Sequence, residues 1–303
     1  MADLISETAR KTAKLESEHN LQVLRKEGLL GLKRPLTIVA SPHPAGSEVP
    51  SGKKVVHLIR HGQGFHNLLS DLWKDFGRTV DPTAKGEGAA DVNPYDRPEV
   101  LDPPLTSIGR RQAQALQPQT ERLQGLELIV VSPVRRATET ALLAFAPRLA
   151  APQCGGQRAV PLLGNEDCAE RKHANICDKR RPMSEVKSEF PMVNWSLVTE
   201  EEDPIYSSTV PEAWRSVSDR GYKLLLWLRD RPEKEVAIAT HSAWLFALMN
   251  TVLACTDPAL AEWFQTGELR SVALEFVNGE EGEEVLERAA KVPRTASDAQ
   301  GTA

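Results

Sequence analysis

Cysteine is scarce in this sequence, and no metal-binding arrangement of it is present. The 303 residues include four cysteines, Cys154, Cys168, Cys177 and Cys255, with no Cys-x-x-Cys pair and no histidine at metal-ligand spacing. A disulfide framework and a structural zinc site are therefore not indicated. We expect free thiols, no metal ion and no cofactor.

Long apolar runs, a secretory signal and an excess of positive charge are also missing. The longest apolar stretch, 243–255, is interrupted by Asn250 and Thr251 and is shorter than the ~20 residues of a membrane-spanning helix. The N-terminus carries charged residues where a signal peptide has its apolar segment. Because the net charge is -5, the chain as a whole is not suited to coating nucleic acid. We expect a cytoplasmic protein that binds neither membranes nor nucleic acid.

Three regions of different composition follow one another along the chain. Residues 1–52 are predicted to form an N-terminal helical arm and a linker, because a charged, loosely helical start precedes a stretch from residue 35 with Pro, Ser and Gly. Residues 53–277 are predicted to form one folded domain. Residues 278–303, rich in Gly, Glu, Ala and Thr, are predicted to be a tail that is disordered at its end.

Three short apolar runs within the domain are typical of buried strands. They are 54–59, 127–131 and 235–240, and a helical pattern follows each of them. This alternation is the signature of βαβ units and predicts the α/β fold class with a mostly parallel sheet. A further strand is predicted at 271–277, at an edge of the sheet.

Two helix starts and one long loop are also marked in the sequence. Ser132 is predicted to cap a helix that begins with Pro133, and Thr209 with Glu212 fits a capping box before a second helix. The stretch 82–104 is rich in Pro and Gly, and a loop of this length is usually functional or a disordered insert.

Polar residues follow the three predicted strands directly. Arg60 and His61 come after the first, Arg136 lies in the helical segment after the second, and His241 comes after the third. Because ligands bind at the carboxyl ends of parallel strands, we expect these side chains to meet. Guanidinium groups and a helix N-terminus suit a phosphate group, and a neutral imidazole is a competent nucleophile. The pattern therefore predicts a phosphate pocket with a histidine nucleophile.

The ordered set of motifs resembles the histidine phosphatase superfamily, in its phosphoglycerate mutase-like branch. The resemblance covers about residues 53–277. The matching segments are Arg60-His61-Gly62-Gln63 with Asn67, Leu105-Thr106 with Gly109 and Gln112-Ala113, Ser132-Pro133 with Arg136-Ala137 and Thr140, and Ala239-Thr240-His241-Ser242. The resemblance implies a three-layer α/β/α sandwich, a metal-independent reaction and a small phosphorylated substrate.

The resemblance also implies roles for individual residues. His61 would become the phosphohistidine, while Arg60, Arg136 and His241 would hold the phosphoryl group. Asn67 would hydrogen-bond that group from the loop after the nucleophile. Family spacing selects Arg136 over its neighbour Arg135, which is expected on the helix surface.

The proton donor in such enzymes is a carboxylic acid between the Arg136 helix and the His241 strand. Glu166, Asp167 and Glu170 are the candidates. Glu170 is favoured, because the segment from Cys168 resembles one in plant and fungal relatives, and Glu166 remains the main alternative. The sequence departs from many relatives at Gly64, where Ser or Thr would add a phosphate hydrogen bond, and at Glu139, where Gln is common.

A basic cluster follows the predicted acid, with Arg171, Lys172, Lys179, Arg180 and Arg181. It is interpreted either as a solvated loop or as a rim for a second anionic group of the substrate.

Three functions remain open at this point. The first is a phosphatase that hydrolyses a phosphomonoester through phosphohistidine at His61. The second is a phosphoglycerate mutase with the same chemistry. The third is a catalytically idle protein that keeps the fold to bind phosphorylated ligands or protein partners.

Overall fold

A seven-stranded sheet is the central feature of the structure, a computed structural model that describes residues 4–149, 159–278, 282 and 284. The strands are β1 Thr37–Pro42, β2 Lys54–Arg60, β3 Leu128–Val131, β4 Leu162–Gly164, β5 Glu235–Thr240, β6 Leu253–Cys255 and β7 Leu269–Val277. The three strands predicted from buried apolar runs are confirmed as β2, β3 and β5.

The sheet is mostly parallel, as expected. Its order is β4-β3-β5-β2-β7-β1-β6, and the first four of these strands run parallel to one another. β7 is antiparallel to both β2 and β1. The predicted strand at 271–277 is therefore real, but its expected place at an edge was wrong, because β1 covers the side that would have been free.

β1 comes from the stretch that the sequence predicted as a linker. It pairs in parallel with β6 and antiparallel with β7, and Ile38 and Ala40 are completely buried. The linker prediction was therefore wrong for residues 37–42. Pro35 precedes this strand and the other Pro, Ser and Gly residues of the stretch start only at its end, so the apolar residues between them can enter the sheet.

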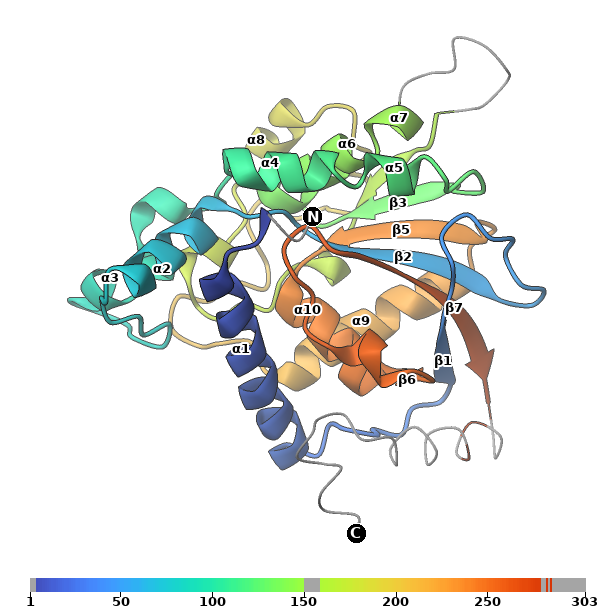
Figure 1. Ribbon diagram of the computed structural model, residues 1–303, viewed down its shortest axis with the longest axis horizontal. Helices are drawn as coiled ribbons and strands as arrows, with labels where there is room; N and C mark the ends of the chain where they lie inside the picture. Colours follow the sequence, from blue (N-terminus) through green and yellow to red (C-terminus); the bar gives the residue numbers. More distant parts are fainter. Residues whose placement is uncertain (1–3, 150–158, 279–281, 283, 285–303) are drawn as a thin grey trace.

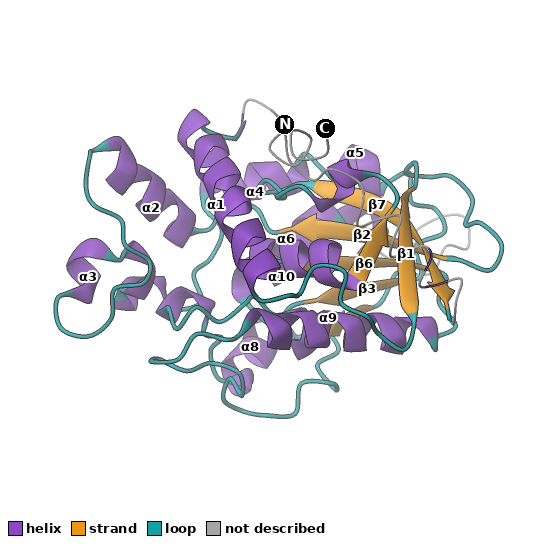
Figure 2. Cartoon of the chain, turned by 90° about the horizontal axis from the view of Figure 1, so that it is seen from below, coloured by secondary structure: helices purple, strands orange, loops and turns teal. Residues whose placement is uncertain are grey.

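Helices cover both faces of the sheet and form a three-layer α/β/α sandwich. They are α1 Glu7–Lys26, α2 Phe65–Asp75, α3 Ala89–Val92, α4 Ser107–Gln114, α5 Gln117–Thr120, α6 Arg135–Ala144, α7 Ala146–Leu149, α8 Met183–Glu189, α9 Trp214–Arg229 and α10 Ser242–Ala247. In Figure 1, α4, α5 and α6 lie on one side of the sheet and α1, α9 and α10 on the other. Figure 2 shows α2 and α3 set apart from the strands, beyond α1.

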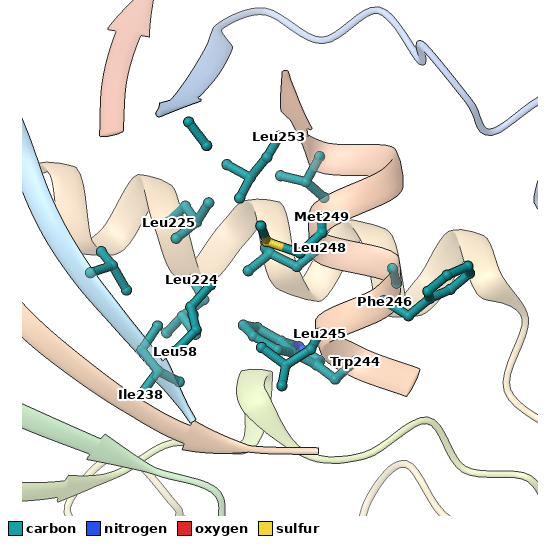
Figure 3. Close-up of a cluster of buried hydrophobic side chains, with 14 of the residues drawn as sticks. Leu58, Leu224, Leu225, Ile238, Trp244, Leu245, Phe246, Leu248, Met249 and Leu253 are labelled. Atoms are coloured by element: carbon teal, nitrogen blue, oxygen red, sulfur yellow. The ribbon is translucent and has the colours of Figure 1, made fainter. Parts of the chain in front are cut away.

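The larger hydrophobic core lies between the sheet and the layer of α9 and α10 (Figure 3). Leu58 of β2 and Ile238 of β5 pack there with Leu224 of α9 and Trp244 of α10, all almost fully buried. Burial of each such side chain contributes about 1.5–3 kcal/mol. This packing fixes β2 and β5 in place, and with them the residues that follow these strands.

Both predicted helix starts differ in the structure. α6 begins at Arg135, three residues after the predicted cap Ser132. The backbone N–H of Arg135 donates a hydrogen bond to the carboxylate of Asp102 at 2.7 Å, so the Ser132 cap was wrong. The capping box before α9 was wrong too, because Glu212 forms an ion pair with Arg220 instead.

The stretch 82–104, left open as a functional loop or an insert, folds into α3 and two short 3-10 turns. The helical arm predicted at the N-terminus is present as α1. In the described part of the chain, no helix is long and apolar enough to cross a membrane. Cys168 and Cys177 are buried free thiols and Cys255 is buried, while Cys154 and most of the predicted tail lie outside the described residues.

Candidate active site

Parallel strands deliver the polar residues of the candidate site to one end of the sheet. Arg60 is the last residue of β2, and His61 and His241 directly follow β2 and β5, which are paired. Ser132 follows β3 on the other side of β5. The convergence predicted for these three strand ends is confirmed. β4 was not predicted from the sequence because it is only three residues long. It leads into the segment that contains Glu166 and Glu170.

The tautomer of His61 is fixed by its hydrogen bonds. Its Nδ1 lies 2.7 Å from the carbonyl oxygen of Gly62, and a carbonyl oxygen only accepts, so Nδ1 carries the proton. Nε2 then holds a lone pair and accepts a hydrogen bond from Nε of Arg136 at 3.2 Å. The unprotonated nitrogen of His61 therefore faces the cationic side chain that the sequence placed in the phosphate pocket.

His61 is held in its neutral form. The residue is 1% exposed, and burial together with the charges of Arg136 and Arg60 lowers its pKa well below the usual value. A backbone hydrogen bond to Gly62 opposes this effect without cancelling it. A neutral imidazole with an oriented lone pair is the form of histidine that acts as a nucleophile.

His241 lies directly beside His61, with the two ring centroids 5.1 Å apart. Its Nε2 is 2.8 Å from the hydroxyl of Ser132, which orients the ring. Its Nδ1 is buried and has no hydrogen-bond partner among the residues that the structure describes. Burial, followed by the charge of Arg136, lowers the pKa of His241 well below its usual value, so this ring is neutral as well.

Arg136 is 1% exposed and is held by three contacts. Besides His61, its guanidinium donates to the carbonyl oxygen of Cys177 at 2.7 Å and to the carboxylate of Asp178 at 3.2 Å. Although burial alone would raise the pKa of Asp178, its contacts with His173 and Arg136 keep it below the usual value. The sequence did not single out Asp178, because its approach to Arg136 depends on how residues 176–178 fold back.

Arg60 is the second buried guanidinium of the site. It donates through Nη1 to the carbonyl oxygen of Phe264 at 2.6 Å, while its Nε is buried and has no partner in the described part of the chain. Burial lowers its pKa, and the carboxylates of Glu16 and Glu170 counteract this effect most strongly. Glu16 belongs to α1, so the N-terminal arm contributes charge to the surroundings of the site.

The loop after His61 packs tightly on the start of α4. A Cβ added to Gly62 would lie 2.4 Å from the carbonyl oxygen of Gly109, and one on Gly109 would lie 2.1 Å from that of Gln63. Thr106 and Gln112 hydrogen-bond to the backbone and side chain of Gln63. The motif of Leu105-Thr106 with Gly109 and Gln112 therefore holds the loop after His61 in position.

Asn67 binds the same loop rather than the other site residues. Its Oδ1 accepts a hydrogen bond from the backbone N–H of Gly64 at 3.0 Å, which closes the first turn of α2. Its role as a phosphate ligand stays a prediction. The neighbouring His66 is 5% exposed and lies 5.8 Å from His61 between ring centroids.

Glu170 and Glu166 occupy different surroundings. Glu170 is 5% exposed, and its carboxylate accepts hydrogen bonds from the backbone N–H groups at the start of α10, directly after His241. Glu166 forms an ion pair with Arg180 at 2.5 Å. The geometry thus brings Glu170, and not Glu166, to the strand end that carries His241.

The basic cluster is neither a solvated loop nor a single rim. Lys172 and Arg180 are completely buried. Lys172 pairs with Asp203 at 2.8 Å, and Arg180 donates to the backbone carbonyls of residues 200–202. The interpretation as a solvated face was wrong for these two residues, because their partners come from a distant loop that the local sequence does not indicate.

Unsatisfied polar atoms gather around His61. Arg60 Nε, His66 Nδ1 and His241 Nδ1 are buried without hydrogen-bond partners among the described residues. Buried polar atoms are normally paired. Arg60 Nε is a donor, and each of the two ring nitrogens is a donor in one tautomer, so the group suits a ligand with several acceptor oxygens. Within the same described part of the chain, no group of three or more His, Cys, Asp or Glu side chains is arranged to hold a metal ion.

Comparison with known proteins places these residues in context. The family model of the histidine phosphatase superfamily (branch 1) matches residues 97–288, which is more than half of the chain and includes Arg136 and His241 but not His61.

The chain is similar to a phosphoglycerate mutase-like protein 1 of Arabidopsis thaliana, with 29% identity over 73% of this chain and 81% of that protein. It is also similar to a probable phosphatase of Schizosaccharomyces pombe, with 26% identity over 62% of this chain and 74% of that protein. Among solved structures, the chain is similar to the alpha-ribazole phosphatase of Shigella flexneri, with a TM-score of 0.43 and 18% identity over 74% of this chain and 96% of that chain.

Proposed function

The chain belongs to the histidine phosphatase superfamily, and from this membership we propose that it is a metal-independent phosphatase that hydrolyses a small phosphomonoester through a phosphohistidine on His61. The observation that carries the proposal is the lone pair of His61 Nε2, which faces Arg136, together with the buried polar atoms near it that have no partner among the described residues. A phosphoryl group offers an electrophilic phosphorus to the lone pair of His61 and acceptor oxygens to the donors among these buried atoms.

In the first step, Nε2 of His61 attacks phosphorus, an N–P bond forms and the bond between phosphorus and the ester oxygen breaks. Arg60, Arg136 and His241 stabilise the charge on the phosphoryl oxygens as it develops. Because His61 is already neutral, no proton has to leave the nucleophile before attack. Asn67 adds a hydrogen bond from its amide.

The ester oxygen leaves with the bonding electrons and needs a proton. Glu170 is proposed as the donor because it lies at the start of α10, beside His241, whereas Glu166 is engaged by Arg180. In the second step, the Glu170 carboxylate takes a proton from water, whose oxygen attacks phosphorus and breaks the N–P bond. Inorganic phosphate and neutral His61 result, and the proton balance is closed.

The direct test is release of phosphate from an aryl phosphate, measured with and without a chelator. We expect activity that survives chelation, an acid-labile phosphoenzyme on rapid quenching, and loss of both in His61→Ala. His19→Ala is the matched control, because this histidine is exposed on α1. Activity lost on chelation, or retained by His61→Ala, would overturn the mechanism, and a wild-type protein that binds phosphate without turnover would favour the idle binding protein.

A mutase remains the second candidate, because a relative at 29% identity is named phosphoglycerate mutase-like. A mutase keeps the phosphohistidine until a hydroxyl of the substrate attacks it, whereas a phosphatase passes it to water. Incubation with 3-phosphoglycerate separates the two. We expect phosphate release to exceed transfer to the 2-position, and the reverse ratio would assign the mutase.

A further inference from the structure

The structure contains a third histidine next to the nucleophile, for which neither the sequence motifs nor the proposed mechanism has a use. His66 is the second residue of α2, and it is 5% exposed. Its ring lies 5.8 Å from that of His61 and 6.3 Å from that of Tyr95 between centroids. Its Nδ1 is buried and has no hydrogen-bond partner in the described part of the chain.

Gly64 is the residue that lets this ring approach. Its φ of -87° and ψ of 164° are open to any residue, so glycine is not needed for backbone conformation. A Cβ at this position would instead lie 2.7 Å from both Nδ1 and Cε1 of His66, and 3.4 Å from Cδ of Arg136. The His66 ring therefore occupies space that a side chain at residue 64 would take, next to the stem of Arg136.

We propose that His66 is a further phosphoryl-binding residue, which donates a ring N–H to a phosphoryl oxygen and replaces the hydroxyl that Gly64 cannot supply. The inference rests on the proposed function, since it adds a ligand to the same phosphoryl site. An unpaired N–H of a buried ring costs stability unless a ligand satisfies it. Three rings, of His61, His66 and His241, then surround the phosphoryl group together with two guanidiniums.

The charge state of His66 agrees with this role. Burial, and after it the charges of Arg136, His61 and Arg60, lowers the pKa of His66 well below its usual value. The neutral ring still carries one N–H and donates without adding a positive charge that Arg136 would repel. A purely structural ring would instead be expected to have its nitrogens paired with protein groups.

His66→Phe is the main test, because it keeps an aromatic ring against Tyr95 and removes both nitrogens. Binding of inorganic phosphate is measured by calorimetry, KM and kcat with an aryl phosphate, and the melting temperature by thermal unfolding. We expect phosphate to bind about 10- to 100-fold more weakly, as for loss of one hydrogen bond to a charged group, with an unchanged or higher melting temperature. Unchanged phosphate affinity and KM would overturn the proposal.

A second pair of variants covers the case in which the Phe ring does not fold. His66→Gln keeps an N–H donor, and His66→Met is apolar and of similar length. We expect the Gln variant to retain part of the phosphate affinity and the Met variant to lose it. Equal affinities of the two variants would contradict the assignment.

The contact with Gly64 gives an independent test through a double-mutant cycle. Gly64→Ala alone should weaken phosphate binding, because the new Cβ displaces the His66 ring. In the His66→Ala background the same change should have little further effect. Additive effects would mean that Gly64 acts without His66.

Failure of this proposal can be told from failure of the proposed function. If the wild type hydrolyses phosphate esters and His66→Phe does so with the same KM, only the role of His66 falls. If the wild type binds phosphate through His66 but turns over no ester, the hydrolase assignment falls and the binding residue stands.

Discussion

Nε of Arg136 donates a hydrogen bond to Nε2 of His61 at 3.2 Å, while Nδ1 of the same ring is tied to the carbonyl oxygen of Gly62. The contact with Gly62 fixes Nδ1 as the protonated nitrogen of His61. The contact with Arg136 places a guanidinium at the unprotonated Nε2. The guanidinium of Arg136 also forms an ion pair with Asp178. The proposed nucleophile and a proposed phosphate ligand are thus oriented by each other before substrate binds.

The first prediction concerns this guanidinium. Arg136→Lys keeps the charge but loses the planar set of donors that joins His61, Cys177 and Asp178. We expect kcat/KM for an aryl phosphate to fall by about 10²- to 10³-fold, as when a transition-state donor is removed. Arg135→Lys is the control, because the adjacent arginine pairs with Glu139 and is partly exposed. Similar losses in both variants would argue against the assignment of Arg136.

The second prediction separates the two acids. If Glu170 protonates the leaving oxygen, Glu170→Gln should lower kcat by about 10²- to 10⁴-fold for an alkyl phosphate. The loss should be much smaller for p-nitrophenyl phosphate, whose leaving group needs little protonation. Glu166→Gln should show no such dependence on the leaving group, because Glu166 is paired with Arg180. A leaving-group effect confined to Glu166→Gln would move the role to that residue.

Much of the fold was predictable from local pattern, because β2, β3 and β5 are continuous apolar runs. β4 and β1 were not, since a three-residue strand has no periodicity and the apolar part of β1 was hidden in Pro-rich surroundings. The helix caps failed for a different reason. Ser132 had the right chemistry for a cap, but the structure uses its hydroxyl to orient His241 and takes the cap of α6 from Asp102.

The candidate site divides in the same way. Arg60, His61, Arg136 and His241 could be predicted because each is placed by a strand end that the sequence reveals. The position of the His66 ring could not be predicted. The ring occupies the space that a Cβ at residue 64 would take, and the local sequence does not reveal this contact.

The third prediction follows from the burial of the basic cluster. Removal of Lys172 in Lys172→Ala leaves the carboxylate of Asp203 buried without its ion-pair partner, which costs about 3–5 kcal/mol of unfolding free energy. Lys179→Ala is the matched control, because this side chain is 35% exposed and lies 4.0 Å from Glu202, so about 1 kcal/mol or less is expected. Urea unfolding measures both. Equally small losses of unfolding free energy in the two variants would mean that Lys172 is a solvated residue and not a buried partner of Asp203.

The last prediction concerns stability and pH. Burial, with nearby positive charge, lowers the pKa of His61, His66 and His241 well below the usual value, so the folded protein keeps all three neutral. The unfolded chain binds protons at these residues as pH falls through about 6.5. Acidification therefore favours the unfolded state, by up to about 1.4 kcal/mol per histidine and pH unit until the folded pKa is reached.

Asp71 acts in the opposite direction, because burial raises its pKa to about 6 and the folded state takes up its proton first. Burial also raises the pKa of Glu16, Asp102 and Glu166, which act in the same direction as Asp71. We expect the three histidines to dominate, so the free energy of unfolding should fall between pH 7 and pH 5.5. Urea unfolding at several pH values measures the slope, and His66→Phe should reduce it because one buried imidazole is gone. Bound inorganic phosphate should reduce it further, since an anion among the three rings favours their protonated forms. A slope that neither change alters would show that these histidines do not carry the pH dependence.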